Sequence, residues 1–538
     1  MTFFQLVRRE MEGSLPRLVF MSGIGGTSNA AILAAVNAGA QAAGEGSVSL
    51  WAAGLFVIAL LLFVKTQHYI LIATTVEIEA IIHRVRLRLM DQVRRSDLLP
   101  LDAIGRSEIV AAITKETGTL TQASQMLAFA GQGAVLVVFV AMYIAYLSFL
   151  AFVVSAIILG AVAVLFHAKS GQLTAGTREA ADWENRLYDR LMDLLDGFKE
   201  VRLNRARSDD LYADIVEVSG TATNIKIRTQ SETFKRLVFT QSSVYLLLGA
   251  IVFVVPTLSD TTGTAITKST TALMFVVGVC FGLVQTIPIL TAANVSAGNI
   301  EQLEARLRAT AAPELGSVQP SRPFGQIEMR NVEFRYVDRT SDAVFKVGPV
   351  DFTLHAGDLV FITGGNGSGK STFLKLLAGL YEPDSGEILL DGVRINDNTR
   401  ESYRVLIAAI FADYHLFQRL YGIPDPDSAE VDRLLTQFRL EDKTRLTDGE
   451  FRTIDLSSGQ RRRLALIVSL LEKRPILLLD EWAADQDPEF RRKFYFELLP
   501  ALNEAGATVV VVTHDDRYLN EMQRAARRLR MDEGRFVE

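Results

Sequence analysis

The sequence predicts a multidomain membrane protein in which an all-α domain of six transmembrane helices precedes an α/β domain. Charged side chains occupy 16% of residues 1–324 but 30% of residues 325–538. Six long apolar stretches lie before residue 300, whereas the later part alternates short apolar runs with glycine-containing turns and helical patterns. The two parts are therefore suited to different solvents, lipid and water.

The six apolar stretches have the length of membrane spans. A hydrocarbon core of about 30 Å requires about 20 apolar helical residues, whereas buried helices of soluble proteins are commonly shorter. Each stretch approaches or exceeds that length, and the second, third and fourth are the most continuous. The predicted spans are residues 17–40, 49–72, 126–147, 149–167, 237–257 and 271–292.

Lysine and arginine orient these spans, because cytoplasmic loops are enriched in both residues. Residues 78–125 carry seven of them and residues 168–235 carry eleven, whereas the connections 41–48 and 258–270 carry one between them, Lys268. Both basic segments, and both ends of the domain, are therefore expected in the cytoplasm.

The first span is the least regular. Gly25 to Asn29 interrupt it, and Ala38-Gly39-Ala40 resembles a signal-peptidase site, so retention and cleavage both stay open, although the length of the apolar region favours retention. The apolar and basic residues between Phe3 and Arg9 predict a short helix at the membrane interface.

Breaks in the helical pattern divide the chain further. Ser96–Leu101 and Asp196–Phe198 interrupt the two basic segments, and each is a candidate contact point for the α/β domain, although an ordinary helix end would look the same. Prolines between residues 313 and 323 predict a linker. The predicted domains are residues 1–315 and 325–538.

Composition excludes several classes of protein. Basic and acidic residues nearly balance in residues 1–324, and acidic residues are in excess in residues 325–538. Neither part has the basic excess of a nucleic-acid-binding protein, so no nucleic-acid partner is expected. The single cysteine, Cys280, excludes an intrachain disulfide framework and a cysteine-type zinc site.

The second part contains a phosphate-binding loop in its required setting, between a strand predicted at Leu359–Thr363 and a helix predicted from Phe373. Glycines let successive backbone N–H groups point at phosphate oxygens, and the helix N-terminus favours negative charge. Lys370 is expected to reach the β and γ phosphates and Ser371 to hold Mg²⁺. The loop comprises Gly364, Gly365, Asn366, Gly367, Ser368, Gly369, Lys370, Ser371 and Thr372.

A second apolar strand, Ile476–Leu479, runs into Asp480 and Glu481. Its continuously apolar pattern predicts a central parallel strand, which places the two acids at its carboxyl end beside the phosphate loop. Asp480 is expected to support Mg²⁺, and Glu481 to orient and deprotonate an attacking water. Paired acids after a strand are more often simple loop residues, so the motif is informative only together with the others.

The order of the motifs indicates a family. Between the two strands lies Leu456-Ser457-Ser458-Gly459-Gln460, followed by Arg461-Arg462-Arg463, and Val512-Thr513-His514 follows the acidic strand. This ordered set resembles the nucleotide-binding domain of ATP-binding-cassette (ABC) transporters over essentially all of residues 325–538. In this setting the arginine run is interpreted as a solvated helix face.

The resemblance implies further roles, with ATP and Mg²⁺ as cofactors. Tyr336 matches the aromatic residue that stacks on adenine, His514 the switch histidine, and Asp487 the D-loop aspartate. The signature loop contacts the γ-phosphate of an ATP held by the opposite subunit. It comprises Ser457, Ser458, Gly459 and Gln460 here.

Two positions depart from the family pattern. Ser458 replaces the first glycine of LSGGQ and is small enough to preserve close backbone approach. The glutamine-loop pattern has Ala412 at the glutamine position, so a metal-binding glutamine is missing. We hypothesise that the adjacent Asp413 supplies an oxygen to Mg²⁺ in its place.

Six spans before the nucleotide-binding domain resemble an exporter-type half-transporter. Residues 197–204, 411–417 and 480–488 are similar to the cyclic-peptide and siderophore exporter group, which includes pyoverdine-precursor and syringomycin-type exporters. The resemblance implies ATP-driven export of a cyclic peptide, siderophore or similar amphipathic peptide across the bacterial inner membrane. One phosphate loop and one signature loop per chain imply a dimer, most simply a homodimer that works by alternating access.

Other functions fit the same motifs. A lipid or multidrug exporter and a siderophore importer share this architecture, and a non-transporting ATP-gated channel or regulator belongs to a different class. The presence of Glu481 and His514 favours ATP turnover over the last of these.

Overall fold

The computed structural model describes residues 2–11, 15–168, 170–258, 263–309, 324–337, 344–423, 425–522 and 526–537. The chain divides into two compact units: unit 1 is residues 1–94 with 104–309, and unit 2 is Arg95–Ala103 with Thr310–Glu538. The predicted linker lies outside the described residues, and the domain bounds 1–315 and 325–538 stay predictions.

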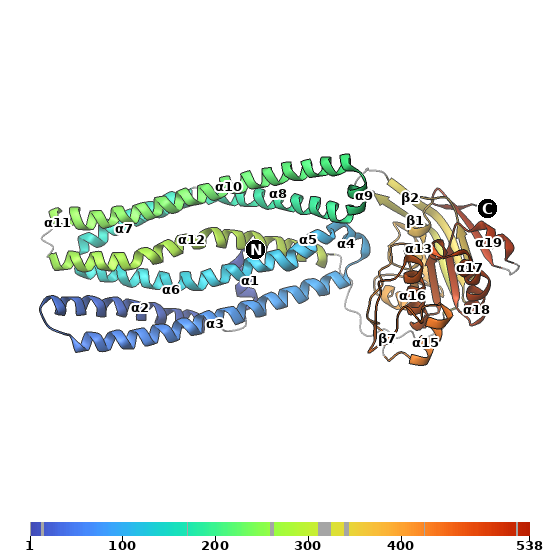
Figure 1. The fold of residues 1–538 in the computed structure, drawn as a ribbon, viewed down its shortest axis with the longest axis horizontal. Coiled ribbons are helices and arrows are strands. Elements are labelled where there is room, and N and C mark those ends of the chain that lie inside the picture. Colours follow the sequence, from blue (N-terminus) through green and yellow to red (C-terminus); the bar gives the residue numbers. More distant parts are fainter. Residues whose placement is uncertain are drawn as a thin grey trace. The chain divides into compact units, whose positions relative to one another are not determined.

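All the secondary-structure elements described in unit 1 are helical. Its long helices lie side by side, with α10 against α8 and α12 against α6 (Figure 1). The elements are α1 Phe3–Glu10, α2 Leu15–Gly44, α3 Leu50–Arg95, α5 Arg106–Ala111, a π-helical turn Ala112–Glu116, α6 Thr117–Leu147, α7 Phe149–Ala168, α8 Ser170–Asp196, α9 Phe198–Leu203, α10 Arg205–Gly249, a π-helical turn Ala250–Val254, α11 Val255–Leu258 and α12 Gly263–Arg308.

Five helical stretches of the described residues are long and apolar enough to cross a membrane. They contain five of the six predicted spans and are Pro16–Gly44, Leu50–Arg95, Glu108–Leu147, Arg205–Leu258 and Ala265–Arg308. The remaining predicted span lies in α7, whose described apolar part, Phe149–Val162, is shorter. The helical membrane domain is confirmed, and the count of six spans stays a prediction.

The interruption expected in the first span is absent, because α2 continues through Gly25 to Asn29. These glycines serve packing instead. A Cβ added to Gly26 would lie 2.4 Å from Val135 Cγ1 of α6, so only glycine lets the two helices approach this closely. The sequence pattern that predicted a break is therefore a helix contact.

The N-terminal helix forms as predicted, but its apolar face packs on protein. Phe3 and Leu6 are each 1% exposed, and the Phe3 N–H donates to Asn294 Oδ1 of α12 at 2.8 Å. The apolar face is thus covered by protein while Phe4 remains exposed, and the interfacial position of the helix stays a prediction. The capping box between Thr2 and Gln5 starts the helix.

A buried ion cluster fastens the end of α1. Arg88 of α3 donates to Glu304 Oε1 at 2.7 Å and to Glu10 Oε1 at 2.9 Å, and Arg9 reaches Glu304 at 3.5 Å. The carboxylates of Glu304 and Glu10 are 3% and 8% exposed, so the arginines supply the partners that buried carboxylates require. The cluster joins α1, α3 and α12.

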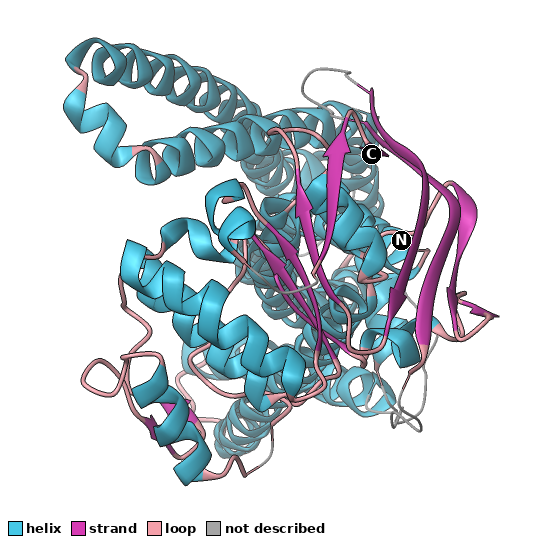
Figure 2. Ribbon diagram, turned by 90° about the vertical axis from the view of Figure 1, so that its right-hand side faces the viewer, coloured by secondary structure: helices cyan, strands magenta, loops and turns pink. Residues whose placement is uncertain are grey.

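Unit 2 contains two larger sheets. The first is antiparallel with strand order β2-β1-β4-β5, and the second has the order β12-β11-β3-β10-β9-β6, parallel except between β11 and β12. Figure 2 shows the long strands of the antiparallel sheet at one side and the shorter strands among the helices. The strands are β1 Gln326–Val337, β2 Val344–His355, β3 Leu359–Thr363, β4 Ser385–Leu390, β5 Val393–Arg394, β6 Ile407–Ile410, β7 Leu446–Thr447, β8 Glu450–Phe451, β9 Ile476–Asp480, β10 Thr508–Val512, β11 Arg527–Asp532 and β12 Arg535–Val537.

Both faces of the six-stranded sheet are covered. Along β9, Ile476 and Leu478 pack on the face that holds α13 and the antiparallel sheet, whereas Leu477 and Leu479 pack on the other helices. This double burial explains the continuously apolar strands. The helical elements of unit 2 are α4 Leu98–Ile104, α13 Lys370–Leu377, α14 Arg400–Arg404, α15 Ser428–Gln437, α16 Ser458–Leu471, a 3-10 turn Trp482–Asp485, α17 Pro488–Lys493, a π-helical turn Phe494–Leu498, α18 Leu499–Glu504 and α19 Asp516–Glu521.

The first predicted break, after α3, packs inside unit 2. Leu98 and Leu99 contact its apolar core, and the Asp97 carboxylate pairs with Arg404 at 3.0 Å and Arg400 at 3.4 Å. Arg400 is only 11% exposed, so this is a partly buried ion pair. The predicted contact of this break with the α/β domain is confirmed.

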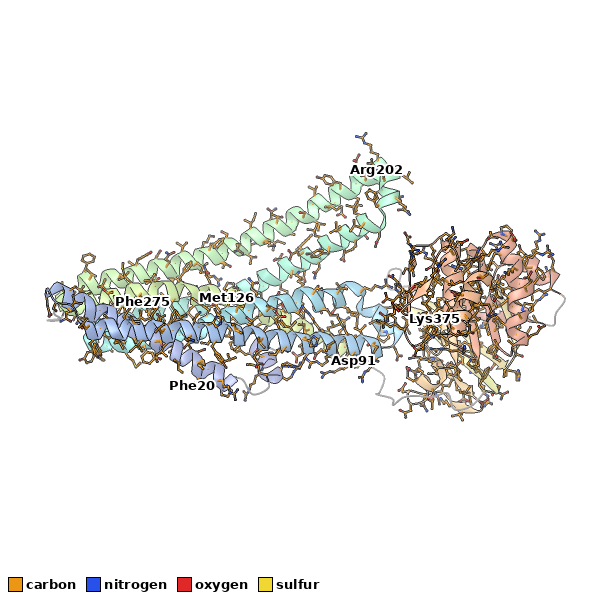
Figure 3. All side chains as sticks on the ribbon, turned by 60° about the horizontal axis from the view of Figure 1, so that its bottom comes forward. Phe20, Asp91, Met126, Arg202, Phe275 and Lys375 are labelled. Carbon is orange, nitrogen blue, oxygen red and sulfur yellow. The ribbon has the colours of Figure 1, made fainter. Side chains whose placement is uncertain are left out.

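The second predicted break separates α8 from α9 at Gly197. Phe198 and Leu203 of α9 are 58% and 88% exposed. Figure 3 shows Arg202 projecting from the end of this helical hairpin. Its predicted contact stays a prediction.

We predict that Glu304→Gln lowers the free energy of unfolding by about 1–3 kcal/mol, because it leaves Arg88 partly buried without its closest partner. The matched control is Glu108→Gln, which weakens a 2.7 Å pair with Arg306 that is almost half exposed on both sides; its expected effect is under about 1 kcal/mol. Thermal unfolding of the purified full chain distinguishes them, and equal melting temperatures would contradict the anchoring role of the cluster.

Candidate functional site

The phosphate loop occupies the turn between β3 and α13. Gly364, Gly367 and Gly369 have φ values of 152°, 76° and 100°, which favour glycine. A Cβ on Gly364 would also lie 2.1 Å from the backbone oxygen of Met531 in β11. Backbone conformation therefore favours glycine at all three positions, and close packing adds to this requirement at Gly364.

Lys370 bends back over this loop. Its Nζ donates to the carbonyl oxygens of Gly365 at 2.7 Å and Gly364 at 3.1 Å. The residue is 5% exposed, and burial lowers its pKa, while the carboxylates of Glu481 and Asp480 act in the opposite direction. The loop thus carries a nearly buried cation that suits a phosphate group.

A cavity of about 400 Å³ opens beside the loop. Its described lining comes from three segments: Phe345 and Lys346 of β2, Gly365 to Ser368, and Asp532 with Glu533. The Ser368 hydroxyl is buried and makes no hydrogen bond with any described residue. A buried hydroxyl without a partner, beside glycine N–H groups, fits a phosphate oxygen.

Asp480 ends β9 at the same sheet edge, since β10 pairs through Val512 with both Asp480 and Ile362. It is 2% exposed; burial raises its pKa, while Ser371 and the backbone of Ala412 lower it. Its Oδ1 makes no hydrogen bond with any described residue. A buried carboxylate oxygen of this kind, next to Ser371, fits Mg²⁺ bound by oxygen ligands.

Glu481 and His514 meet at the ends of neighbouring strands. His514 Nε2 lies 3.0 Å from Glu481 Oε1, and both side chains are partly exposed, at 41% and 36%. Glu481 adopts a left-handed backbone conformation with φ 49° and ψ 32°. The structure therefore brings the two predicted catalytic residues together at the open edge of the sheet.

The signature loop begins α16. Ser457 is the N-cap, accepting from Gln460 N at 3.4 Å, while Gln460 Oε1 accepts from Ser457 N at 3.1 Å. The serine and glutamine of LSSGQ thus form a capping box. A Cβ on Gly459 would lie 2.6 Å from the backbone oxygen of Asp485, whereas Ser458 is exposed, so position 459 requires glycine and position 458 does not.

The arginines that follow do not form the solvated face predicted from the sequence. Only Arg461 is exposed; the side chains of Arg462 and Arg463 are 12% and 11% exposed. Arg462 Nε pairs with Asp485 Oδ2 at 3.0 Å, and Arg463 Nη2 with Asp487 Oδ2 at 2.6 Å. Two of the three arginines therefore hold the D-loop segment, Asp485–Asp487.

Further contacts complete this attachment. Gln486 accepts from Arg463 Nε at 2.8 Å and donates to the Gly459 carbonyl at 3.1 Å. Asp487 caps α17 by accepting from Phe490 N at 2.8 Å, and this N–H, followed by Arg463, holds the pKa of Asp487 below its usual range. The D-loop and the signature loop of one chain are consequently a single connected structure.

Arg491 connects the D-loop to the switch segment. It donates to the carbonyl oxygens of Ala483, Ala484 and Gln486 at 3.1, 2.9 and 3.2 Å, and it pairs with Asp515, next to His514, at 3.4 Å. The sequence motifs did not indicate that Arg462, Arg463 and Arg491 hold the D-loop. The available signal was charge complementarity, because acidic residues follow Trp482 and these three arginines lie on the helices α16 and α17.

Two predicted site residues are less defined. The structure describes the backbone of Tyr336, paired with Phe345 in the sheet, but its side chain lies outside the described part. Asp413 is exposed, and its side chain makes no hydrogen bond or ion pair with any described residue. The backbone of its neighbour Ala412 interacts with Asp480, which places the glutamine position beside the predicted metal ligands.

Comparison with known proteins places these features in a family. Residues 347–484 match the ABC transporter family model. Along 99% of its length the chain is 32% identical to ATP-binding protein SyrD of Pseudomonas syringae pv. syringae, covering 96% of that protein. It is also 32% identical to an ATP-dependent lipid A-core flippase of Pseudomonas putida, but over 42% of this chain and 39% of the flippase.

The fold has a solved counterpart. The structure of a bacterial Atm1-family ABC exporter with ATP bound superposes with a TM-score of 0.79, covering 99% of this chain and 95% of that one at 20% identity. This likeness concerns the fold, whereas the similarity to SyrD extends over the whole sequence. The chain therefore belongs to the ABC transporter family, which couples ATP hydrolysis to transport, and it has the fold of an exporter-type half-transporter.

Proposed function

We propose that two copies of this chain form an exporter that moves a cyclic peptide, siderophore or similar amphipathic peptide out across the bacterial inner membrane. The observation that carries the proposal is the incomplete site of one chain. The described lining of its phosphate-loop cavity includes no residue of the signature loop, whose Ser457 is exposed at the start of α16. A second copy supplies that loop.

In this proposal, each ATP lies between the phosphate loop of one copy and the signature loop of the other. Lys370 and the loop N–H groups bind the phosphates, Ser371 and Asp480 hold Mg²⁺, and Tyr336 stacks on adenine. Ser457, Ser458, Gly459 and Gln460 complete the site from the second copy. A shared binding site links ATP binding to closure of the two copies.

Glu481 is the proposed general base. Its carboxylate stands 3.0 Å from His514 Nε2, and a carboxylate at the open sheet edge is able to accept a proton from water. His514 orients that carboxylate and senses the γ-phosphate, and Asp487 contributes through the D-loop. Hydrolysis then lets the two copies separate.

The segment Arg95–Ala103 transmits this movement. Asp97 binds Arg400 and Arg404 within unit 2, and α3 ends at Arg95, the first residue of the segment. A displacement of α14 therefore acts on the end of a long membrane helix. The exposed apolar residues Phe198 and Leu203 of α9 are proposed to dock on the second copy. The basic segments support a cytoplasmic location for these regions, the ATPase unit and both termini.

The membrane helices favour an amphipathic cargo. Tyr146 and Tyr245 are 87% and 56% exposed in the single chain, and Gln241 and Gln285 are also exposed. Polar groups facing lipid are costly, so these side chains are better placed on a path shared with the second copy. By contrast, Asn37 is buried and donates to Tyr143 at 3.5 Å, which serves helix packing.

We predict that Gly459→Ala reduces ATP hydrolysis about tenfold or more, while nucleotide affinity changes less than about twofold. The added Cβ would separate the signature loop from Asp485, but the phosphate loop is untouched. The control is Gly220→Ala in α10, where no atom lies within 4 Å of the added Cβ. Steady-state hydrolysis and nucleotide binding by the full chain test this, and normal turnover would contradict the assignment of the signature loop.

We predict that Glu481→Gln lowers kcat for ATP about 100-fold or more while ATP still binds, because the amide cannot accept the proton of the attacking water. Glu489→Gln is the matched control, since Glu489 is 73% exposed and pairs only at the surface with Arg439. Phosphate release by the full chain in nanodiscs is the measurement. Undiminished hydrolysis by Glu481→Gln would refute the proposed base.

The cargo is tested by comparing secreted and retained metabolites of cells that lack the protein, express it, or express Glu481→Gln. We expect amphipathic peptides to accumulate inside cells of the first and third kinds and to leave cells of the second. Accumulation of a lipid or of an unrelated drug in the inner leaflet would instead support the alternative exporters. Uptake of a siderophore from the medium would support import.

We predict that Asp413→Ala raises the Mg²⁺ concentration needed for half-maximal hydrolysis several-fold, because it removes the oxygen proposed to replace the missing glutamine. Adding Ala412→Gln to this variant should restore the Mg²⁺ dependence. An unchanged Mg²⁺ dependence of the single variant would remove Asp413 from the metal site.

A further inference from the structure

Arg462 is the side chain that connects the signature helix directly to Glu481. Its Nη1 donates to the backbone carbonyl oxygen of Glu481, and its Nε pairs with Asp485 at 3.0 Å. Its own backbone carbonyl accepts from Trp482 Nε1 at 2.8 Å. Arg462 therefore contacts the residues on both sides of the turn that follows Glu481.

This contact matters because Glu481 has an unusual backbone. A non-glycine residue in the left-handed region is uncommon and persists where its surroundings hold it. The Glu481 N–H donates to Val512 O at 3.0 Å, and the Glu481 carbonyl accepts from Arg462. The two sides of the residue are thus held by β10 and by α16, and this conformation aims the carboxylate at His514.

The surroundings of Arg462 are well packed. Its side chain is 12% exposed, and Trp482, which donates to the Arg462 backbone carbonyl, is 0% exposed beside Phe490 and Phe494. Arg463 fastens the next residues of the D-loop from the adjacent position of the same helix. A displacement of the start of α16 is consequently transmitted to the turn at Glu481.

We propose that Arg462 is a positioning residue that sets the backbone conformation of Glu481 and makes the orientation of the general base depend on the signature helix. The inference rests on the proposed role of Glu481. The signature loop of the first copy binds the ATP held by the second copy. A movement of this loop on ATP contact therefore changes, through Arg462, the position of Glu481 in the first copy. The two ATP sites of a dimer are thereby linked within each chain.

A planar guanidinium is required for this arrangement. It donates in two directions at once, to a carbonyl oxygen and to a carboxylate, whereas a lysine ammonium on a flexible stem does so with poorer geometry. Arg462→Lys should therefore retain part of the function and Arg462→Gln very little. Arg461, one residue earlier and exposed, provides the control of equal charge.

The test measures steady-state ATP hydrolysis of the full chain in nanodiscs. We expect Arg462→Gln to lower kcat about tenfold with the KM for ATP changed less than about twofold, because substrate binding is left intact and the base is misplaced. Arg462→Lys should fall between this variant and the native chain, and Arg461→Gln should match the native chain. An equal loss of kcat in Arg461→Gln and Arg462→Gln would show that removal of one positive charge explains the effect, and it would overturn the proposal.

A double-mutant cycle with Asp485→Asn separates positioning from loss of structure. If both side chains act through one contact, the double variant should lose no more kcat than Arg462→Gln alone. Additive losses would overturn the shared contact, and a fall in melting temperature that accounts for the lost activity would overturn the positioning role.

The proposed function is tested separately. Slow hydrolysis by Glu481→Gln together with a native kcat in Arg462→Gln would remove this inference and leave Glu481 as the base. Undiminished hydrolysis by Glu481→Gln would remove the base itself, whatever the behaviour of the Arg462 variants.

Discussion

Burial of both faces of the six-stranded sheet is the constraint on which the ATPase unit depends. Leu477 and Leu479 face one apolar core and Ile476 and Leu478 the other, so a polar side chain is tolerated along β9 only where the strand ends. Asp480 and Glu481 stand at that end, His514 follows the neighbouring strand β10, and the phosphate loop follows β3 on the other side of β10. The polar and charged residues of the site lie at the carboxyl edge of the sheet because apolar packing on both faces excludes such side chains from the rest of the strands.

Arginines organise the rest of the site. Arg462 and Arg463 join the D-loop to the signature helix, and Arg491 joins it to the switch segment. These guanidinium groups bind backbone carbonyls as well as carboxylates, which restricts main-chain movement more than a single surface ion pair does. The catalytic edge and the signature loop therefore respond together, as a shared site between two copies requires.

In unit 1, a close helix contact and a buried ion cluster fix the positions of the helices. Gly26 allows α2 to approach α6, and the cluster of Arg88, Glu10 and Glu304 joins three helices. The segment around Asp97 is attached to the ATPase unit in the same way, by a carboxylate between Arg400 and Arg404. Charge is sparse in this part of the chain, and where it is buried it fixes the relative positions of elements.

Local patterns determined the family, the fold class and the core of the site. A glycine loop between strand and helix, and two acids after an apolar run, indicate one edge of a parallel sheet, so the grouping of Lys370, Asp480 and Glu481 was predictable, whereas His514 was implied by the resemblance of the ordered motifs. The exposure of the arginines was not predictable from the sequence, because Arg461 and Arg462 have the same side chain and differ only in what packs over them. Likewise, only the fold decided that Gly26 is a contact and that Phe3 faces protein. Periodicity records which face is apolar, but the partner of that face is set by residues distant in the sequence.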